Sequence, residues 1–326
     1  MTDPATDPDS DLDAEHGLPH DPLWPRAGDW PSFDDLEPGI HPDLAIIGLP
    51  AWRTSLSPTG AHATPAAIRE VLRRYSPALM PDRSSTSRLV LDHLDLAALV
   101  TVDAGDVDDP DGPIGEGRAI AAVADAADRA RLLVALGGDN SVTVATALGV
   151  WGEALPAAGL VTLDAHYDLR DGESNGSPVR RLIEAGLDGH RVVQIGIADF
   201  ANSAEYARRA LDYGITVVHR DELHRRPMSD VMAEALDIAG AAGGPIHVDL
   251  DVDVCDRSVA PGCPASVPGG ISAWELRAAA RAAAADDRVR SIDIAEVDAT
   301  ADAEDGRTVR LAALLVLEAL AGVALR

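Results

Sequence analysis

Short apolar runs alternate with amphipathic, alanine-rich segments from about Asp43 to the end of the chain. The apolar runs have the length of strands and the amphipathic segments that of helices, so the pattern predicts about eight strands, each followed by a helix or loop. The strands are predicted at 44–48, 99–102, 131–136, 159–163, 191–197, 214–218, 245–251 and 290–295. The helices are predicted at 65–74, 117–129, after 141, and at 178–186, 202–211, 228–240, 272–285 and 308–323. This order predicts an α/β fold with a mainly parallel sheet that is covered on both faces.

The first 42 residues follow a different pattern, with many Asp and Pro residues and little apolar periodicity. They predict an acidic, Pro-rich N-terminal tail over 1–42, mobile or lying along the surface. No linker-like break interrupts the alternating pattern that follows. We therefore expect 43–326 to form a single domain.

Composition excludes several classes of function. The formal net charge of −27 disfavours binding to nucleic acid or to anionic membranes, and no apolar stretch reaches membrane-spanning length. The N-terminus lacks the pattern of a signal peptide, and the two cysteines, Cys255 and Cys263, provide no disulfide framework. These features predict a soluble, cytoplasmic protein.

Three side chains of the metal-ligand type follow the predicted strand 159–163. Asp164, His166 and Asp168 alternate with other residues, so an extended backbone would point all three to one side. Two carboxylates and an imidazole on one side of a strand end are difficult to explain by packing. They indicate a site for a divalent metal ion.

A second run, 245–254, shows the same alternation. Asp249, Asp251 and Asp253 are separated by apolar residues that are typical of a covered central strand. Three buried aspartates on one side of a strand would repel one another unless a cation neutralised them. The alternative is an exposed acidic edge strand. Two such runs in one chain favour more than one metal ion.

Ligands in parallel α/β sheets bind beyond the carboxyl ends of the strands. Four polar clusters of this chain fall at or just past predicted strand ends, which predicts that they form one site. The clusters are Gly137-Gly-Asp-Asn-Ser141, Asp164-Ala-His-Tyr-Asp168, Asp251-Val-Asp253 and Ala295-Glu296.

This series of motifs, extended to Asp256 and to Glu296-Val-Asp, resembles the ureohydrolase superfamily of arginases, agmatinases and formimidoylglutamases. The resemblance covers roughly residues 42–326. It implies a three-layer α/β/α fold with an eight-stranded sheet, a centre of two Mn²⁺ ions, and hydrolysis of a guanidinium or formimidoyl C–N bond. It also implies a homo-oligomer, either a trimer or a hexamer, acting on a small-molecule substrate.

The resemblance also implies roles for individual residues. Asp164 and Asp251 would bridge the two metals, Asp168 would complete the shell of one ion, and His166 and Asp253 that of the other. Glu296 would pair with the cationic amidine group of the substrate and, with the bridging Asp164 and Asp251, form the catalytic group. Asp249 would precede the ligand pair, although a register shifted by two residues would make it a ligand instead.

The chain departs from the superfamily pattern at two positions. Asn140 stands where the first metal ligand is usually a histidine, and its side-chain oxygen can still coordinate a hard ion such as Mn²⁺. Asn175 stands where arginases and agmatinases carry a histidine that is thought to shuttle protons. Formimidoylglutamases tend to lack that histidine, and their motifs are matched by Arg170 and by the loop that contains Ser177 and Arg180.

Arginines near the mouth of the site suit N-formimidoyl-L-glutamate, since guanidinium groups bind its two carboxylates. Structural pairing of Arg170 and Arg180 with nearby acids is the alternative. We therefore predict a dimanganese formimidoylglutamase that binds substrate through Arg170, Asn175, Ser177, Arg180 and Glu296. The other hypotheses are an agmatinase-like or guanidino-acid hydrolase that releases urea, and a non-catalytic, metal-poor relative that acts as a binding protein.

Overall fold

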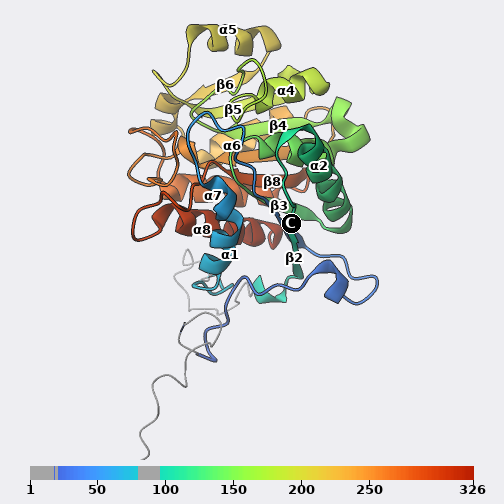
Figure 1. Cartoon of the computed structure of the whole chain (residues 1–326). Helices are drawn as coiled ribbons and strands as arrows, with labels where there is room; N and C mark the ends of the chain where they lie inside the picture. Colours follow the sequence, from blue (N-terminus) through green and yellow to red (C-terminus); the bar gives the residue numbers. More distant parts are fainter. Residues whose placement is uncertain (1–17, 19–20, 80–95) are drawn as a thin grey trace, which may run out of the picture.

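The computed structural model of the chain describes residues 18, 21–79 and 96–326. Within them, eight parallel strands form one sheet in the order β2-β1-β3-β8-β7-β4-β5-β6 (Figure 1). The strands are β1 (Leu44–Leu49), β2 (Thr101–Asp106), β3 (Leu132–Gly137), β4 (Gly159–Leu163), β5 (Val192–Ile197), β6 (Thr216–His219), β7 (Ile246–Asp251) and β8 (Val289–Ala295). The predicted parallel sheet is confirmed.

Helices cover both faces of the sheet, which gives the three layers expected of an arginase-like fold. One face packs against α1 (Thr64–Leu72), α6 (Met228–Ala239), α7 (Ala273–Ala285) and α8 (Arg307–Val323). The other packs against α2 (Gly112–Arg129), α3 (Val142–Trp151) and α4 (Pro178–Ala185), while α5 (Ala204–Tyr213) lies beyond the β6 edge (Figure 1). Among the described helices, none is long and apolar enough to cross a membrane.

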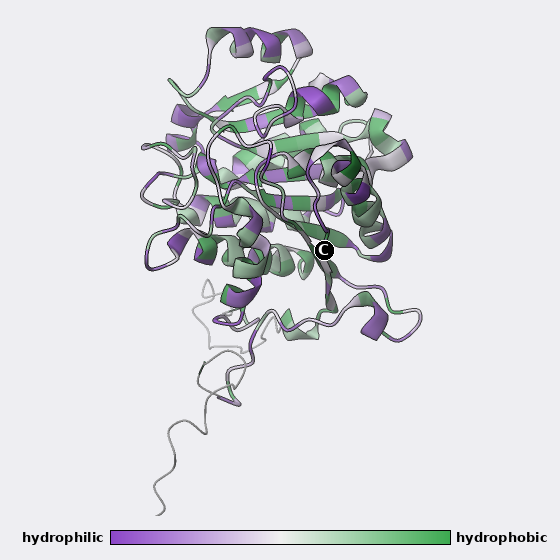
Figure 2. Ribbon diagram, viewed as in Figure 1, coloured by the Kyte–Doolittle hydropathy of each residue, from purple (hydrophilic) through white to green (hydrophobic). Residues whose placement is uncertain are grey.

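Alternation along β1 explains why one strand serves both layers. Leu44 and Ile46 pack in the core under α1 and α8, whereas Ala45 and Ile47 pack in the core under α2. All six residues of this strand are buried, since successive side chains point to opposite, equally covered faces. Figure 2 shows the same distribution, with hydrophobic strands inside and hydrophilic outer faces on the helices.

Element boundaries differ from the predicted ones mainly near the N-terminus. Helix α2 begins at Gly112 instead of 117, because Pro113 fits the first turn of a helix. Part of the predicted tail contacts the domain: Ala27 is buried, and the Pro31 carbonyl accepts a hydrogen bond from Asp103 N. The tail residues 1–17 and 19–20 lie outside the described residues.

Candidate metal centre

Four neighbouring strands at the centre of the sheet bring the polar clusters together. Asn140 follows β3, Asp164 follows β4, Asp251 ends β7 and Glu296 follows β8, and these strands are adjacent in the order β3-β8-β7-β4. A cavity of about 510 Å³ opens at this edge, with acidic side chains on its floor. Its lining includes His166, Asp168, Asp251, Asp253 and Glu296.

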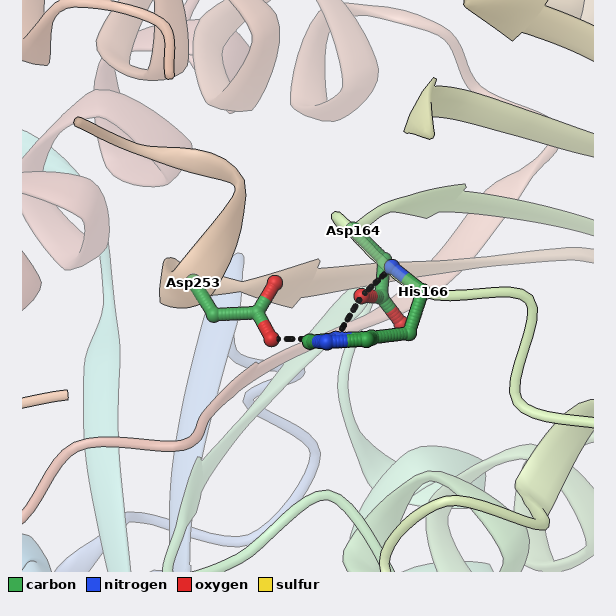
Figure 3. Close-up of side chains that lie close together, drawn as sticks. All are labelled: Asp164, His166 and Asp253. Carbon is green, nitrogen blue, oxygen red and sulfur yellow. Dashed lines mark hydrogen bonds and ion pairs between the residues drawn. The ribbon is translucent and has the colours of Figure 1, made fainter. Parts of the chain in front are cut away.

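Asp164, His166 and Asp253 form the most compact group of potential ligands. His166 Nδ1 lies 2.7 Å from Asp253 Oδ2 and 3.4 Å from Asp164 Oδ1, and the three side chains point toward one another (Figure 3). Backbone amides hold both carboxylates, since Ala165 N donates to Asp253 Oδ1 at 2.9 Å and His166 N donates to Asp164 Oδ1 at 2.6 Å. The two loops that follow β4 and β7 are thereby joined.

A second group lies beside the first. Asn140 Nδ2 donates to Asp168 Oδ2 at 2.6 Å, and Asn140 Oδ1 accepts a hydrogen bond from Thr143 Oγ1 at 2.9 Å. The charge of Asp164 acts on Asp168, and Asp251 Oδ1 accepts a hydrogen bond from Asp253 N at 2.8 Å. Of the residues predicted as metal ligands, His166, Asp168, Asp251 and Asp253 line the cavity, while Asn140 and Asp164 lie behind them in contact with Asp168 and His166.

Burial and mutual repulsion disfavour the ionised form of several carboxyl groups here. Desolvation and the charge of Asp164 raise the pKa of Asp168 well above its usual value. Desolvation, together with Asp253 and Asp164, does the same to the pKa of Asp251. The pKa of Asp164 rises to about 6, chiefly through burial and then through the charge of Asp253. The metal-free site therefore holds more acid than it can ionise at neutral pH.

His166 and Glu296 are also shifted. Burial disfavours a charged imidazole, but the charges of Asp253 and Asp164 outweigh it and raise the pKa of His166 to about 12. In return, His166 overcomes the effect of burial on Asp253 and lowers the pKa of that carboxyl group. Burial and the charge of Asp139 raise the pKa of Glu296 to about 8, against the opposing hydrogen bonds from Asn175 and Asn140.

The donor set fits a divalent cation. One ligand atom each from Asp164, His166 and Asp253 can be chosen so that all three lie within 4.8 Å of one another. Asp164 Oδ2 is buried and has no hydrogen-bond partner within the described residues, so this oxygen is available as a ligand. Carboxylate oxygens with one imidazole suit Mn²⁺, and a cation would offset the repulsion among the buried acids.

The backbone is unusual at three residues that line the cavity. Asp168, Phe200 and Glu296 adopt positive φ angles of 52°, 64° and 62°, a backbone region that residues other than glycine rarely occupy. Each such residue costs on the order of 1–3 kcal/mol and persists only where the surrounding structure enforces it. The clustering indicates that these positions serve the site at the expense of local stability.

The local geometry differs from the predicted alternation. Strand β4 ends at Leu163, so 164–168 is a loop rather than an extended segment, and Asp253 lies in a 3₁₀ turn over Val252–Val254. The side chains converge through hydrogen bonds to backbone amides instead of through strand alternation. Asp249 lies inside the sheet, paired in register with Asp293, whereas Asp251 and Asp253 line the cavity.

The residues predicted to bind substrate fall into two sets. Arg170, Asn175 and Glu296 line the cavity. Ser177 is buried in a turn, where it bonds to the backbone of Ser174, and does not line the cavity. The Arg180 guanidinium contacts Glu184 and the carbonyls of Gly172 and Arg170, with Nε 2.5 Å from the Arg170 oxygen. The contacts of Ser177 and Arg180 thus shape the loop that carries Arg170.

Two supporting residues were missed by the sequence analysis. Asn202 Nδ2 donates to the Ala165 carbonyl at 2.8 Å, and Asn202 Oδ1 accepts from Tyr167 N at 3.1 Å, so this side chain clamps the loop that carries His166. Arg220 donates to the carbonyls of Gly196 and Val254 beneath the same loops. Arg220 lies just past the predicted strand 214–218 and Asn202 begins the predicted helix 202–211, so a position beyond a strand end was the signal that could have found them.

Replacing Asn202 with Ala is expected to lower Mn²⁺ affinity by about 10–100-fold, the usual effect of removing a residue that orients metal ligands. Calorimetric titration of the metal-free variant with Mn²⁺ measures the change. Ser203→Ala is the matched control, because Ser203 caps α5 through Tyr206 N without contacting the His166 loop. Equal Mn²⁺ affinity in Asn202→Ala and wild type would show that the clamp is dispensable.

Comparison with known proteins agrees with this geometry. The sequence model of the arginase family matches residues 42–322. A formimidoylglutamase of Halalkalibacterium halodurans is 33% identical over 293 residues, which cover 86% of each chain. The crystal structure of the Bacillus subtilis formimidoylglutamase is similar with a TM-score of 0.82 at 28% identity, covering 94% of both chains. That of the Trypanosoma cruzi formiminoglutamase with Mn²⁺ gives 0.76 at 25% identity, covering 87% of this chain and 94% of the other. The chain belongs to the arginase family.

Proposed function

We propose that this protein is a dimanganese formimidoylglutamase, which hydrolyses N-formimidoyl-L-glutamate to L-glutamate and formamide. The observation that carries the proposal is the charge distribution of the cavity, which has an acidic floor and a single guanidinium, that of Arg170, among its described lining residues. A substrate with a cationic amidine at one end and carboxylates at the other is complementary to this distribution. The similarity to proteins named formimidoylglutamase supports the same substrate.

Glu296 is the group suited to the amidine end. Its carboxyl group is almost completely buried yet lines the cavity beside Asp251 and Asp253. A carboxylate in such a position binds an amidinium by charge-assisted hydrogen bonds, which are stronger where water is excluded. Binding of the cationic substrate would also favour the ionised form of Glu296. The carbon to be attacked is thereby oriented above the metal ligands.

Arg170 is the group suited to the carboxylate end. No carboxylate within the described residues forms an ion pair with its guanidinium, which lies 5.9 Å from the centre of the Tyr206 ring. Its side chain packs closely on Gly176, where an added Cβ would lie 2.7 Å from Arg170 Cδ. The aliphatic part of the side chain thus lies against Gly176, while its charge is available to a ligand.

Arg170→Ala is expected to raise KM for N-formimidoyl-L-glutamate by about 10–100-fold with a smaller effect on kcat, since charge-assisted hydrogen bonds contribute about 1.5–3 kcal/mol. Steady-state kinetics at saturating Mn²⁺ measures both constants. Arg209→Ala is the matched control, because Arg209 flanks the same Tyr206 ring but is paired with Asp171 at 2.6 Å. A KM that rises equally in the two variants would assign Arg170 a structural role.

The reaction breaks the bond between the formimidoyl carbon and the glutamate nitrogen. The water oxygen ends on the carbon as the formamide carbonyl, and both water protons end on the glutamate nitrogen, which leaves the cationic amidine as an ammonium group. When bound, two divalent cations supply a water of lowered pKa that acts as the nucleophile at neutral pH. Asn140, Asp164, His166, Asp168, Asp251 and Asp253 would hold them, of which Asp164, His166 and Asp253 form the most compact group.

A substrate panel tests the proposal against its alternatives. The Mn²⁺-loaded protein is assayed for formamide from N-formimidoyl-L-glutamate and for urea from agmatine, arginine and guanidinobutyrate. We expect formamide release to dominate. Dominant urea release would identify a guanidino-acid hydrolase instead, and less than one Mn²⁺ per chain at saturation would favour a non-catalytic relative. Within the proposed function, we place the reaction in histidine breakdown in the cytoplasm, carried out by a trimer or hexamer.

A further inference from the structure

The carboxyl group of Glu296 is held through only one of its oxygens. Oε1 accepts hydrogen bonds from Asn175 Nδ2 at 2.7 Å and from Asn140 N at 2.8 Å. A carboxylate oxygen has two lone pairs in its plane, so these donors fill Oε1. No donor from the described residues reaches Oε2. Since Glu296 lines the cavity, Oε2 is the oxygen left for a ligand.

Asn175 holds this arrangement from a different loop. Its side-chain Oδ1 accepts a hydrogen bond from Leu56 N at 3.0 Å, and its backbone N–H donates to the Thr54 carbonyl at 3.3 Å. Leu56 lines the cavity as well. Asn175 therefore connects the segment 54–57 to the carboxyl group of Glu296. The oxygen and the nitrogen of its side-chain amide are both hydrogen-bonded.

We propose that Asn175 is a positioning residue that limits Glu296 to one oxygen for the substrate and thereby selects formimidoyl over guanidino groups. The inference rests on the proposed function and deepens it. A formimidoyl group has one terminal nitrogen, whereas a guanidino group carries a second terminal nitrogen in place of the C–H hydrogen. A single free oxygen satisfies the first group and leaves the additional NH₂ of the second without a carboxylate partner. A buried donor left unpaired lowers affinity.

Two compounds that differ only at this carbon provide the test: N-formimidoyl-L-glutamate and N-carbamimidoyl-L-glutamate. We expect the Mn²⁺-loaded wild type to bind or turn over the formimidoyl compound better by about tenfold or more. Asn175→Ala removes both side-chain bonds. Asn175→Asp keeps the shape and the acceptor for Leu56 but lacks the donor to Glu296. Both variants are expected to lower the preference by about tenfold, the loss typical of one hydrogen bond to a charged group.

Glu173→Ala is the control, because Glu173 is exposed in the same loop and does not line the cavity. If the role of Asn175 were merely structural, its replacement would weaken the binding of both compounds equally. The ratio of their affinities would then be unchanged, which would overturn the inference. The affinity for a compound that is turned over is taken from its KM. The affinity for a compound that is not turned over is measured by calorimetric titration. The ratio is therefore obtained even if the wild type fails to hydrolyse N-formimidoyl-L-glutamate, an outcome that would contradict the proposed function alone.

Discussion

Asp251→Asn is expected to abolish hydrolysis and the binding of at least one Mn²⁺ ion at the proposed metal centre, while making the metal-free protein more stable. Asp251 is 2% exposed, and burial together with Asp253, Asp164 and Glu296 raises its pKa. Asparagine keeps the acceptor for Asp253 N but removes the buried charge. The loss of this proposed metal ligand is expected to lower kcat/KM by at least about 10³-fold, because bound metal contributes several kcal/mol to catalysis.

The gain in stability is measured by thermal unfolding in EDTA. Relief of about 1 kcal/mol of repulsion would raise Tm by about 2–4 °C in a domain of this size. Asp256→Asn is the matched control: this carboxyl group accepts hydrogen bonds from Ser258 and Gly269, which lower its pKa, so its loss is expected to destabilise. A lower Tm for metal-free Asp251→Asn, or two bound Mn²⁺ ions, would contradict the assigned role.

Mn²⁺ affinity is expected to rise by at least about tenfold per pH unit between pH 6 and 8. Metal ligands must be deprotonated, and each proton released per bound ion contributes a tenfold change per unit. Because the charges of Asp253 and Asp164 raise the pKa of His166 to about 12, at least one proton must leave the site when the metal binds at neutral pH. Calorimetry in two buffers of different ionisation enthalpy counts them. An affinity that is equal at pH 6 and 8 would show that the site is already deprotonated.

The same pKa shifts determine how the metal-free protein responds to pH. The acids have unfolded pKa values of about 4. In the folded protein the pKa is raised to about 6 for Asp164 and to about 8 for Glu296. Their contribution to the free energy of unfolding is therefore present below pH 4 and is lost as the pH rises to 8. The contribution of His166 is complete below about 6.5 and declines from there toward its folded pKa of about 12. Tm in EDTA should therefore be lower at pH 8 than at pH 5.5, and saturating Mn²⁺ should reverse this order.

Most of the fold and the membership of the site follow from local patterns. Apolar runs of strand length identified all eight strands, because a parallel sheet that is covered on both faces requires them. Placement at strand ends brought Asn140, Asp164, Asp251 and Glu296 into one group, since the carboxyl ends of parallel strands share an edge. These inferences need no knowledge of how the chain turns after each strand.

What could not be predicted depends on the loops. Asp253 was expected in an extended backbone but lies in a turn, because its carboxylate bonds to Ala165 N in a loop 88 positions earlier. The same holds for Asn202, whose partners are backbone atoms of another loop. Arg170 and Arg180 look equivalent in the sequence, yet only Arg170 lines the cavity. Contacts between distant loops leave no periodic trace in a sequence.

The order of the strands has a consequence for synthesis of the chain on the ribosome. Strands β3 and β4 are consecutive in the sequence but are separated in the sheet by β8 and β7, which are made last. Until residues 246–295 emerge, β2-β1-β3 and β4-β5-β6 can form only two incomplete half-sheets with exposed edges. A nascent chain therefore exposes those edges until then, and the group of Asp164, His166 and Asp253 can assemble only after β7 has been translated.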